Sequence, residues 1–135
     1  MRKTALRAVT EMARRDPRVC FIGSDLGAGV MDDFRADMPD RLFREGVSEQ
    51  HVIGMAGGLA LEGKIVYVNT LATFLTRRCY EQLMLDLALY RAKVRLIGSG
   101  GGLVYAPLGP THVTTEDMGL LRLIPNMAVV APCDA

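Results

Sequence analysis

The sequence predicts an α/β fold, namely a three-layer, doubly wound and mostly parallel sheet with helices on both faces. Short apolar runs of strand type recur along the chain, such as RVCFIG over 18–23 and KIVYVNT over 64–70. Between them lie longer segments whose apolar residues fall at helical spacing. Strands that alternate with helices in this way are typical of a parallel α/β sheet.

The first helix is expected over 4–15, with Thr4 as its N-cap. The strand over 18–23 runs into the loop 24–27, and loops at that end of an open α/β sheet usually contact ligands. A short helix is expected next, over 30–38.

A strand, a helix and a strand follow. The strand is expected over 41–46. The helix is expected over 48–62, where the residues at i, i+3, i+4 and i+7 from Val52 are apolar. The third strand covers 64–70, and a long amphipathic helix covers 73–92.

The last third of the chain should form a strand over 94–98, a helix over 115–123 and a fifth strand over 127–130. No internal repeat, low-complexity segment or linker interrupts it, so we expect a single domain over 1–135. Because the chain stops directly after a predicted strand, either it is cut short there or a partner covers that edge.

Composition argues against several classes of function. Hydrophobic residues make up 50% of the chain and the net charge is only +1, with the basic residues scattered, which argues against nucleic-acid binding. The longest mostly apolar run, 65–75, is too short to span a membrane, and no signal peptide is recognisable. Three cysteines without C-x-x-C spacing favour reduced thiols over a disulfide framework or a metal site. A cytoplasmic protein is expected.

Three glycines stand inside the helix expected over 48–62. Each of Gly54, Gly57 and Gly58 costs about 1 kcal/mol relative to alanine in a helix. We expect a backbone, a helix or a flat ligand to approach this face closely, and we assign the glycines to packing against a cofactor or a partner subunit. The alternative is an irregular helix packed on its own sheet.

Glu49 lies in or just before the first turn of the same helix. A carboxylate there complements the helix dipole, and position alone would favour that modest role. The surrounding string G-V-S-E-Q-H, the small-residue helix and a strand that leads to Phe74 indicate more.

This stretch resembles the pyrimidine-binding domain of the transketolase family, which includes 1-deoxyxylulose-5-phosphate synthase. The likeness continues in R-C-Y-E-Q at 78–82, G-P-T-H at 109–112, R-L-I-P-N-M at 122–127 and P-C-D-A at 132–135. Several motifs in the family's order are far more specific than any one of them. The resemblance covers the chain from about Arg18 to Ala135.

The resemblance implies thiamine diphosphate as cofactor and Glu49 as the catalytic acid. In that family the matching glutamate contacts N1′ of the aminopyrimidine. A proton shared there favours the imino tautomer, whose 4′-nitrogen removes the proton from C2 of the thiazolium.

The remaining site residues also follow from the resemblance. Phe74 matches the aromatic residue that stacks on the aminopyrimidine, although core packing is the usual fate of a lone phenylalanine. Leu71 stands where relatives often carry another aromatic, and Asp25 matches a cofactor-facing A-D-L segment, with loop capping as its alternative. His112 matches the histidine of G-P-T-H, which helps to bind the donor sugar.

Two departures bear on the substrate. Many transketolases carry a histidine where Gly100 stands, and an acid where Leu108 stands. Both groups hold sugar hydroxyls, so the resemblance implies a less hydroxylated or otherwise modified donor in place of an ordinary pentose phosphate.

The chain lacks the G-D-G…N motif that holds the diphosphate through Mg²⁺ in this family. The resemblance therefore implies that a partner chain binds the diphosphate and Mg²⁺, and that the complex transfers a two-carbon ketol unit between sugar-type substrates. The chain would be the second subunit of a split transketolase, in a hetero-oligomer with further self-association. The alternative is a catalytically decayed scaffold or regulatory subunit of the same fold.

Overall fold

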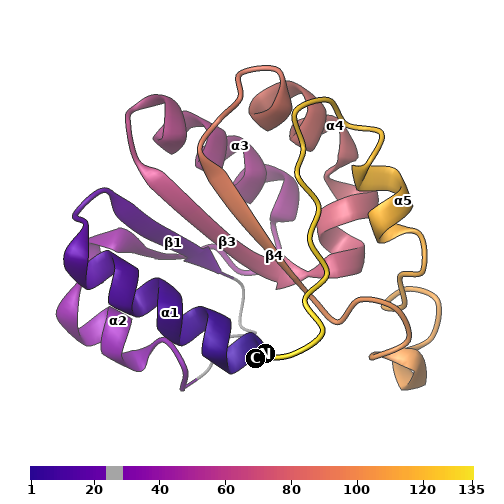
Figure 1. The fold of residues 1–135 in the computed structure, drawn as a ribbon, viewed down its shortest axis with the longest axis horizontal. Helices are drawn as coiled ribbons and strands as arrows, with labels where there is room; N and C mark the ends of the chain where they lie inside the picture. The colour runs from indigo at the N-terminus through magenta and orange to yellow at the C-terminus, as the bar shows by residue number, and fades with distance from the viewer. Residues whose placement is uncertain (24–28) are drawn as a thin grey trace.

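The computed structural model describes residues 1–23 and 29–135 and contains a four-stranded sheet in the order β2-β1-β3-β4 (Figure 1). The strands are β1 Val19–Gly23, β2 Leu42–Arg44, β3 Ile65–Leu71 and β4 Val94–Ser99. Each neighbouring pair runs in parallel. The predicted α/β class with a parallel sheet is confirmed.

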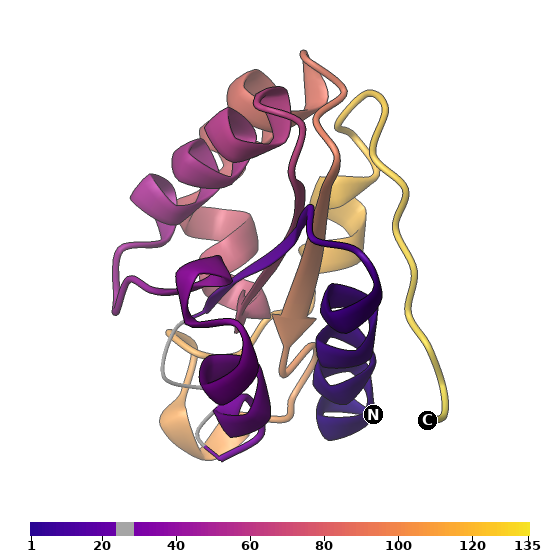
Figure 2. The same cartoon turned by 90° about the vertical axis from the view of Figure 1, so that its left-hand side faces the viewer.

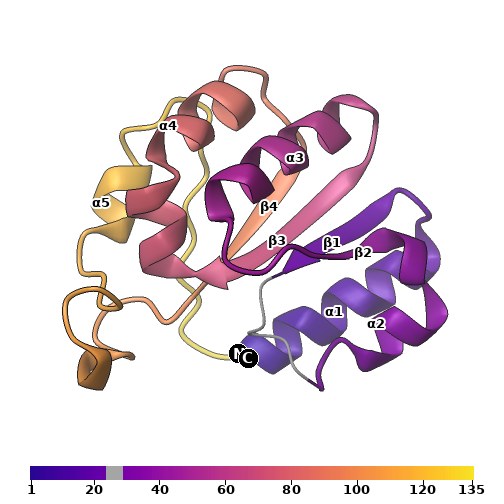
Figure 3. The ribbon, with the colours of Figure 1, turned by 180° about the vertical axis from the view of Figure 1, so that it is seen from behind.

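Helices cover both faces of the sheet. The α-helices are α1 Arg2–Arg15, α2 Asp32–Asp37, α3 Glu49–Leu61, α4 Tyr80–Gln82 and α5 Asp117–Leu121. In Figure 2, α1 and α3 lie on opposite sides of the sheet. Figure 3 shows α3, α4 and α5 grouped together, away from α1 and α2. The three layers agree with the prediction, although Met1 and not Thr4 is the N-cap of α1.

Two apolar cores lie against the two faces of the sheet. In β1, Val19 and Phe21 pack with α1 and α2, whereas Cys20 and Ile22 pack with α3 and the helical segment after β3. All five residues of β1 are buried. A strand covered on both faces has no polar side, and this explains why β1 is apolar throughout. Within the described residues 1–23 and 29–135, no helix has both the length and the apolarity needed to cross a membrane.

The long helix expected over 73–92 is present but irregular. Two π-helical stretches, Phe74–Arg78 and Leu83–Ala88, flank α4, and only turns follow over 89–91. A π-helical turn accommodates an extra residue, and such turns are frequent at functional sites. The first stretch begins shortly after β3 ends, so it places Phe74 and Arg78 at the carboxyl edge of the sheet.

The prediction of a fifth strand over 127–130 is wrong. These residues form no strand, and β4 is the edge of the sheet in the part of the chain that the structure describes. The segment 126–135 runs past β4 instead, and a groove of about 1650 Å³ is lined by both of them (Figure 1).

Of the three glycines of α3, Gly57 serves packing within the chain. A β-carbon at Gly57 would lie 2.7 Å from the backbone oxygen of Asp86, so α3 and the segment Leu83–Ala88 pack closely there. The expected close approach of a helix is confirmed at Gly57, but its assignment to a cofactor or partner subunit is wrong. A β-carbon at Gly54 would be 3.5 Å from a carboxylate oxygen of Asp86, and one at Gly58 would meet nothing within 4 Å.

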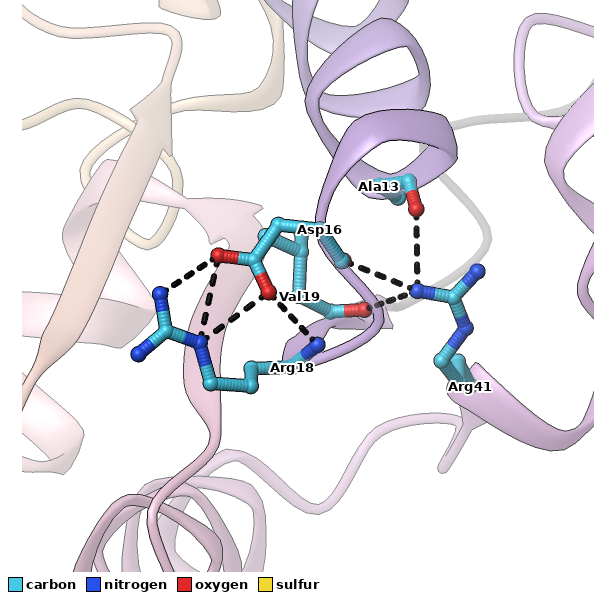
Figure 4. A network of polar contacts seen from close by, with 5 residues as sticks. All are labelled: Ala13, Asp16, Arg18, Val19 and Arg41. Atoms are coloured by element: carbon cyan, nitrogen blue, oxygen red, sulfur yellow. Dashed lines mark hydrogen bonds and ion pairs between the residues drawn. The ribbon is translucent and has the colours of Figure 1, made fainter.

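A polar network joins the end of α1 to the start of β1 (Figure 4). Nη1 of Arg41 donates hydrogen bonds to the backbone oxygens of Ala13, Asp16 and Val19 at 2.9, 3.1 and 3.2 Å. Arg18 pairs with the Asp16 carboxylate at 2.7 Å and lowers the pKa of that carboxyl to about 2. The bond to Ala13 satisfies a carbonyl group that the last turn of α1 leaves free.

Candidate functional site

Glu49 is the first residue of α3, and its side chain is buried in spite of its charge. Its exposed fraction is 3%. Ser48 precedes it and donates from Oγ to the backbone oxygen of Glu45 at 2.6 Å, which fixes the turn into the helix. Stabilisation by a helix dipole does not require burial, so the dipole does not account for this burial. A carboxylate this deeply buried needs a charged or hydrogen-bonding partner.

Arg78 provides that partner. Its Nη1 donates to Oε2 of Glu49 at 2.6 Å. The central carbon of the same guanidinium lies 4.3 Å from the centroid of the Phe74 ring, which is the geometry of a cation–π contact. The guanidinium therefore joins the predicted acid to the predicted stacking residue.

The sequence places Arg78 within the R-C-Y-E-Q motif without indicating a role for it. A signal is present, because residues four apart in a helix lie on the same side, and Phe74 and Arg78 have this spacing. Only the folded structure shows that Arg78 pairs with Glu49, which lies 29 residues away in the sequence.

His112 reaches the same cluster from the loop after β4. Its ring lies edge-on to Phe74, with centroids 5.2 Å apart and planes at 68°. Oγ1 of Thr111 lies 2.9 Å from its Nδ1. The structure thus brings together Glu49, Phe74 and His112, three of the five residues predicted for the site.

Arg77 fastens the loop that carries His112. Its Nη1 donates to the backbone oxygen of Pro110 at 2.8 Å, and its Nε forms an ion pair with Glu116. The pair lowers the pKa of Glu116 to about 2, chiefly through the hydrogen bond from Arg77. Arg77 therefore binds the loop that carries His112, whereas Arg78 binds the Glu49 carboxylate.

Glu116 is expected to titrate near pH 2 and not near its usual pKa of 4.5. Because the folded chain binds the proton less readily than the unfolded chain, the pair stabilises the fold fully above pH 4.5, and this contribution is lost as the pH falls towards 2. Carbon-13 NMR of the glutamate carboxyl groups measures the midpoint, and Arg77→Gln should return it towards 4.5. A wild-type midpoint already at the usual value would contradict the pairing.

Cys79 lies next to this cluster, and its surroundings keep the thiol unreactive. Its side chain is fully buried, and burial together with the nearby charge of Glu49 raises the pKa of the thiol to about 12. A thiol must ionise to act as a nucleophile, so Cys79 is a packing residue at neutral pH.

The other two predicted residues are placed less directly. Leu71 is the last residue of β3 and is half-buried at the same carboxyl edge as Phe74. Asp25 lies outside the described residues. Among residues 1–23 and 29–135, no group of three or more histidine, cysteine or acidic side chains could hold a metal ion.

The sequence matches one family model along its whole length. That model is described as "Transketolase, pyrimidine binding domain", and it matches residues 1–135. An apulose-4-phosphate transketolase subunit of Phocaeicola vulgatus is 36% identical over 135 residues, which are 99% of this chain and 43% of that protein. A 6-deoxy-6-sulfo-D-fructose transketolase subunit, SqwH of a Clostridium species, is 35% identical and is covered to 42% of its length by 100% of this chain. The chain therefore spans less than half the length of these relatives.

Solved structures agree with this match. A structure described as "Split gene transketolase, inactive beta4 tetramer" has a TM-score of 0.80 at 28% identity, over 93% of this chain and 40% of that one. A transketolase from Pichia stipitis has a TM-score of 0.75 over 90% of this chain and 20% of its own. Its identity is 18%, so it supports the fold alone.

Proposed function

Because the chain belongs to the family of transketolase pyrimidine-binding domains, we propose that it supplies the pyrimidine-facing half of a thiamine diphosphate site. The proposed reaction is transfer of a two-carbon ketol unit between sugar-type substrates, in a complex with a chain that binds the diphosphate. One observation carries the proposal. The buried Glu49 carboxylate and the face of Phe74 both contact the flat guanidinium group of Arg78.

The residues of the site fit an aminopyrimidine ring. The guanidinium of Arg78 is flat, donates a hydrogen bond to Glu49 and stacks on Phe74. A planar group with a hydrogen-bonding edge therefore has room between these two side chains. Glu49 would hold the nitrogen edge of the ring, and Phe74 would stack on its face.

When bound, thiamine diphosphate would supply the carbon nucleophile that ketol transfer requires. Glu49 would share a proton with the ring nitrogen at its carboxylate, which is buried. His112, held against Phe74, contacts the donor sugar in this proposal. Leu71 forms an aliphatic wall beside Phe74, and a contact from Asp25 to the cofactor rests on family resemblance alone.

A partner chain completes the proposed site. We assign Mg²⁺ and the diphosphate to that partner, because the G-D-G…N motif is missing from this sequence. A similar solved protein, the split-gene transketolase, is described as inactive as a beta4 tetramer, which supports a need for a second kind of chain.

Thiamine diphosphate is expected to bind the complex of this chain with a diphosphate-binding subunit and not this chain alone. Isothermal titration calorimetry in the presence of Mg²⁺ measures binding to each chain separately and to the complex. Tight binding to this chain by itself would refute the half-site, and the absence of binding to the complex would refute the proposed function.

The donor in this proposal is a modified ketose. Two relatives are named for apulose-4-phosphate and 6-deoxy-6-sulfo-D-fructose. At Gly100, where many transketolases carry a sugar-binding histidine, φ is +79° and a β-carbon would lie 2.0 Å from Cε2 of Tyr105. The space that a side chain at position 100 would enter is taken by the Tyr105 ring.

A catalytically inactive scaffold of the same fold is the second candidate, and Gly100 and the exposed Leu108 favour it. The joined Glu49 and Phe74 favour catalysis. The two candidates differ in one measurement. A complex that binds thiamine diphosphate but transfers no ketol unit from modified or unmodified ketose phosphates would support the scaffold.

A further inference from the structure

We propose that Arg78 occupies the place of the aminopyrimidine ring in the cofactor-free chain and has to leave it when the cofactor binds. The inference rests on the proposed function of the site. It makes Arg78 a competing residue that keeps Glu49 paired until the cofactor arrives, and that thereby sets how tightly the cofactor is held.

The two contacts of Arg78 are the two contacts that the site offers to the cofactor ring. Its Nη1 donates to Oε2 of Glu49 at 2.6 Å, and its guanidinium carbon lies 4.3 Å from the centroid of Phe74. A guanidinium resembles an aminopyrimidine edge because it is planar, delocalised and rich in N–H donors. In this proposal the cofactor ring stacks on the face of Phe74 that the guanidinium now covers, and one face cannot hold both groups at once.

Burial explains why Glu49 needs such a partner before the cofactor binds. Glu49 is 3% exposed, and an unpaired charge at that depth is strongly destabilising. The ion pair with Arg78 removes this penalty while no ligand is present. A bound ring nitrogen that shares a proton with Glu49 would remove it equally well, so the two states can exchange one partner for the other.

Arg78 can leave without unfolding its surroundings. Its side chain is 42% exposed, in contrast to the buried carboxylate it binds. It stands at the end of the π-helical stretch Phe74–Arg78, before the backbone departs from helical geometry at Cys79. Its neighbour Arg77 holds the loop through Pro110 and Glu116, so the loop stays fastened when Arg78 moves.

The variant Arg78→Gln, in the complex with the diphosphate-binding subunit, tests whether Arg78 competes with the cofactor. The test is whether the affinity for thiamine diphosphate rises or falls. The variant removes the cation that the cofactor must displace, so thiamine diphosphate should bind about tenfold more tightly, the ratio that one lost charge-assisted hydrogen bond implies. The cofactor-free complex should melt at a lower temperature, because Glu49 loses its partner. Arg95→Gln is the matched control, since Arg95 also stacks on an aromatic ring, Tyr67 at 5.9 Å, and it should change neither value.

Unchanged or weaker cofactor binding by Arg78→Gln would overturn the inference, because Arg78 would then be a bystander or a cofactor ligand. A measurement on the wild-type complex is independent of how the variant folds. The NMR signal of the Arg78 Nε–H group, shifted by the Phe74 ring in the free complex, should lose that shift when thiamine diphosphate is added, and a signal that keeps it would equally overturn the inference. If the wild-type complex does not bind the cofactor, the proposed function is overturned instead. This result is measured on the wild-type complex and does not depend on the variant.

Discussion

Glu49→Gln is expected to lower ketol transfer by the assembled complex by about 10²- to 10⁴-fold, the contribution of a positioned proton-transfer group. Glutamine keeps the shape of the side chain and still accepts a hydrogen bond from Arg78 where Oε2 now stands. It lacks the acidic proton that a carboxyl shares with a ring nitrogen. The measurement is kcat at saturating thiamine diphosphate, so that weaker cofactor binding is not mistaken for slower chemistry.

Glu62→Gln is the matched control for this experiment. Glu62 is the C-cap of the same helix and is exposed, so its substitution removes the same charge far from the cluster. We expect kcat to stay at the wild-type value. A Glu49→Gln complex that also works within a few-fold of wild type would exclude a catalytic role for this carboxylate.

Gly57→Ala is expected to destabilise the fold by about 1–3 kcal/mol, the usual cost of overpacking a core contact. The new β-carbon would lie 2.7 Å from the backbone oxygen of Asp86 and 3.3 Å from Cδ2 of Leu87. The leucine can adjust, but the carbonyl oxygen belongs to a helix backbone, so α3 and the segment Leu83–Ala88 must move apart. Urea unfolding gives the change in the free energy of unfolding.

Gly58→Ala, one residue further along α3, should have the opposite sign. A β-carbon there meets nothing within 4 Å, so alanine adds only its better helix propensity, about 1 kcal/mol at most. Equal losses at both positions would mean that α3 resists any side chain, and that the Asp86 contact is not the cause.

The elements with strong periodicity can be predicted from the sequence, and those that depend on pairing cannot. The helix expected over 48–62 is α3, Glu49–Leu61, because its apolar spacing and its flanking turns agree. The run 127–130 has the composition of a strand, but a strand exists only where a neighbouring backbone accepts its hydrogen bonds. No local signal in the sequence states whether such a neighbour is present, and here the run stays unpaired.

The candidate site divides in the same way. Motifs predict Glu49, Phe74 and His112, and the structure places them in one cluster. They predict no role for Arg78, because its part depends on which buried anion faces the helix after folding. The glycine at position 57 likewise indicates a close approach, while its partner is visible only in the packing of α3 on its neighbouring helix.

The contact between Gly100 and Tyr105 constrains how this sequence can evolve. A histidine at position 100 would need a left-handed backbone at φ +79° and the space that the Tyr105 ring fills. A single-step change to the histidine of many relatives therefore meets both a backbone and a steric penalty, and a smaller residue at position 105 would remove the steric one. A lineage that carries this tyrosine therefore gains that sugar contact at position 100 only if the Tyr105 ring moves or is replaced.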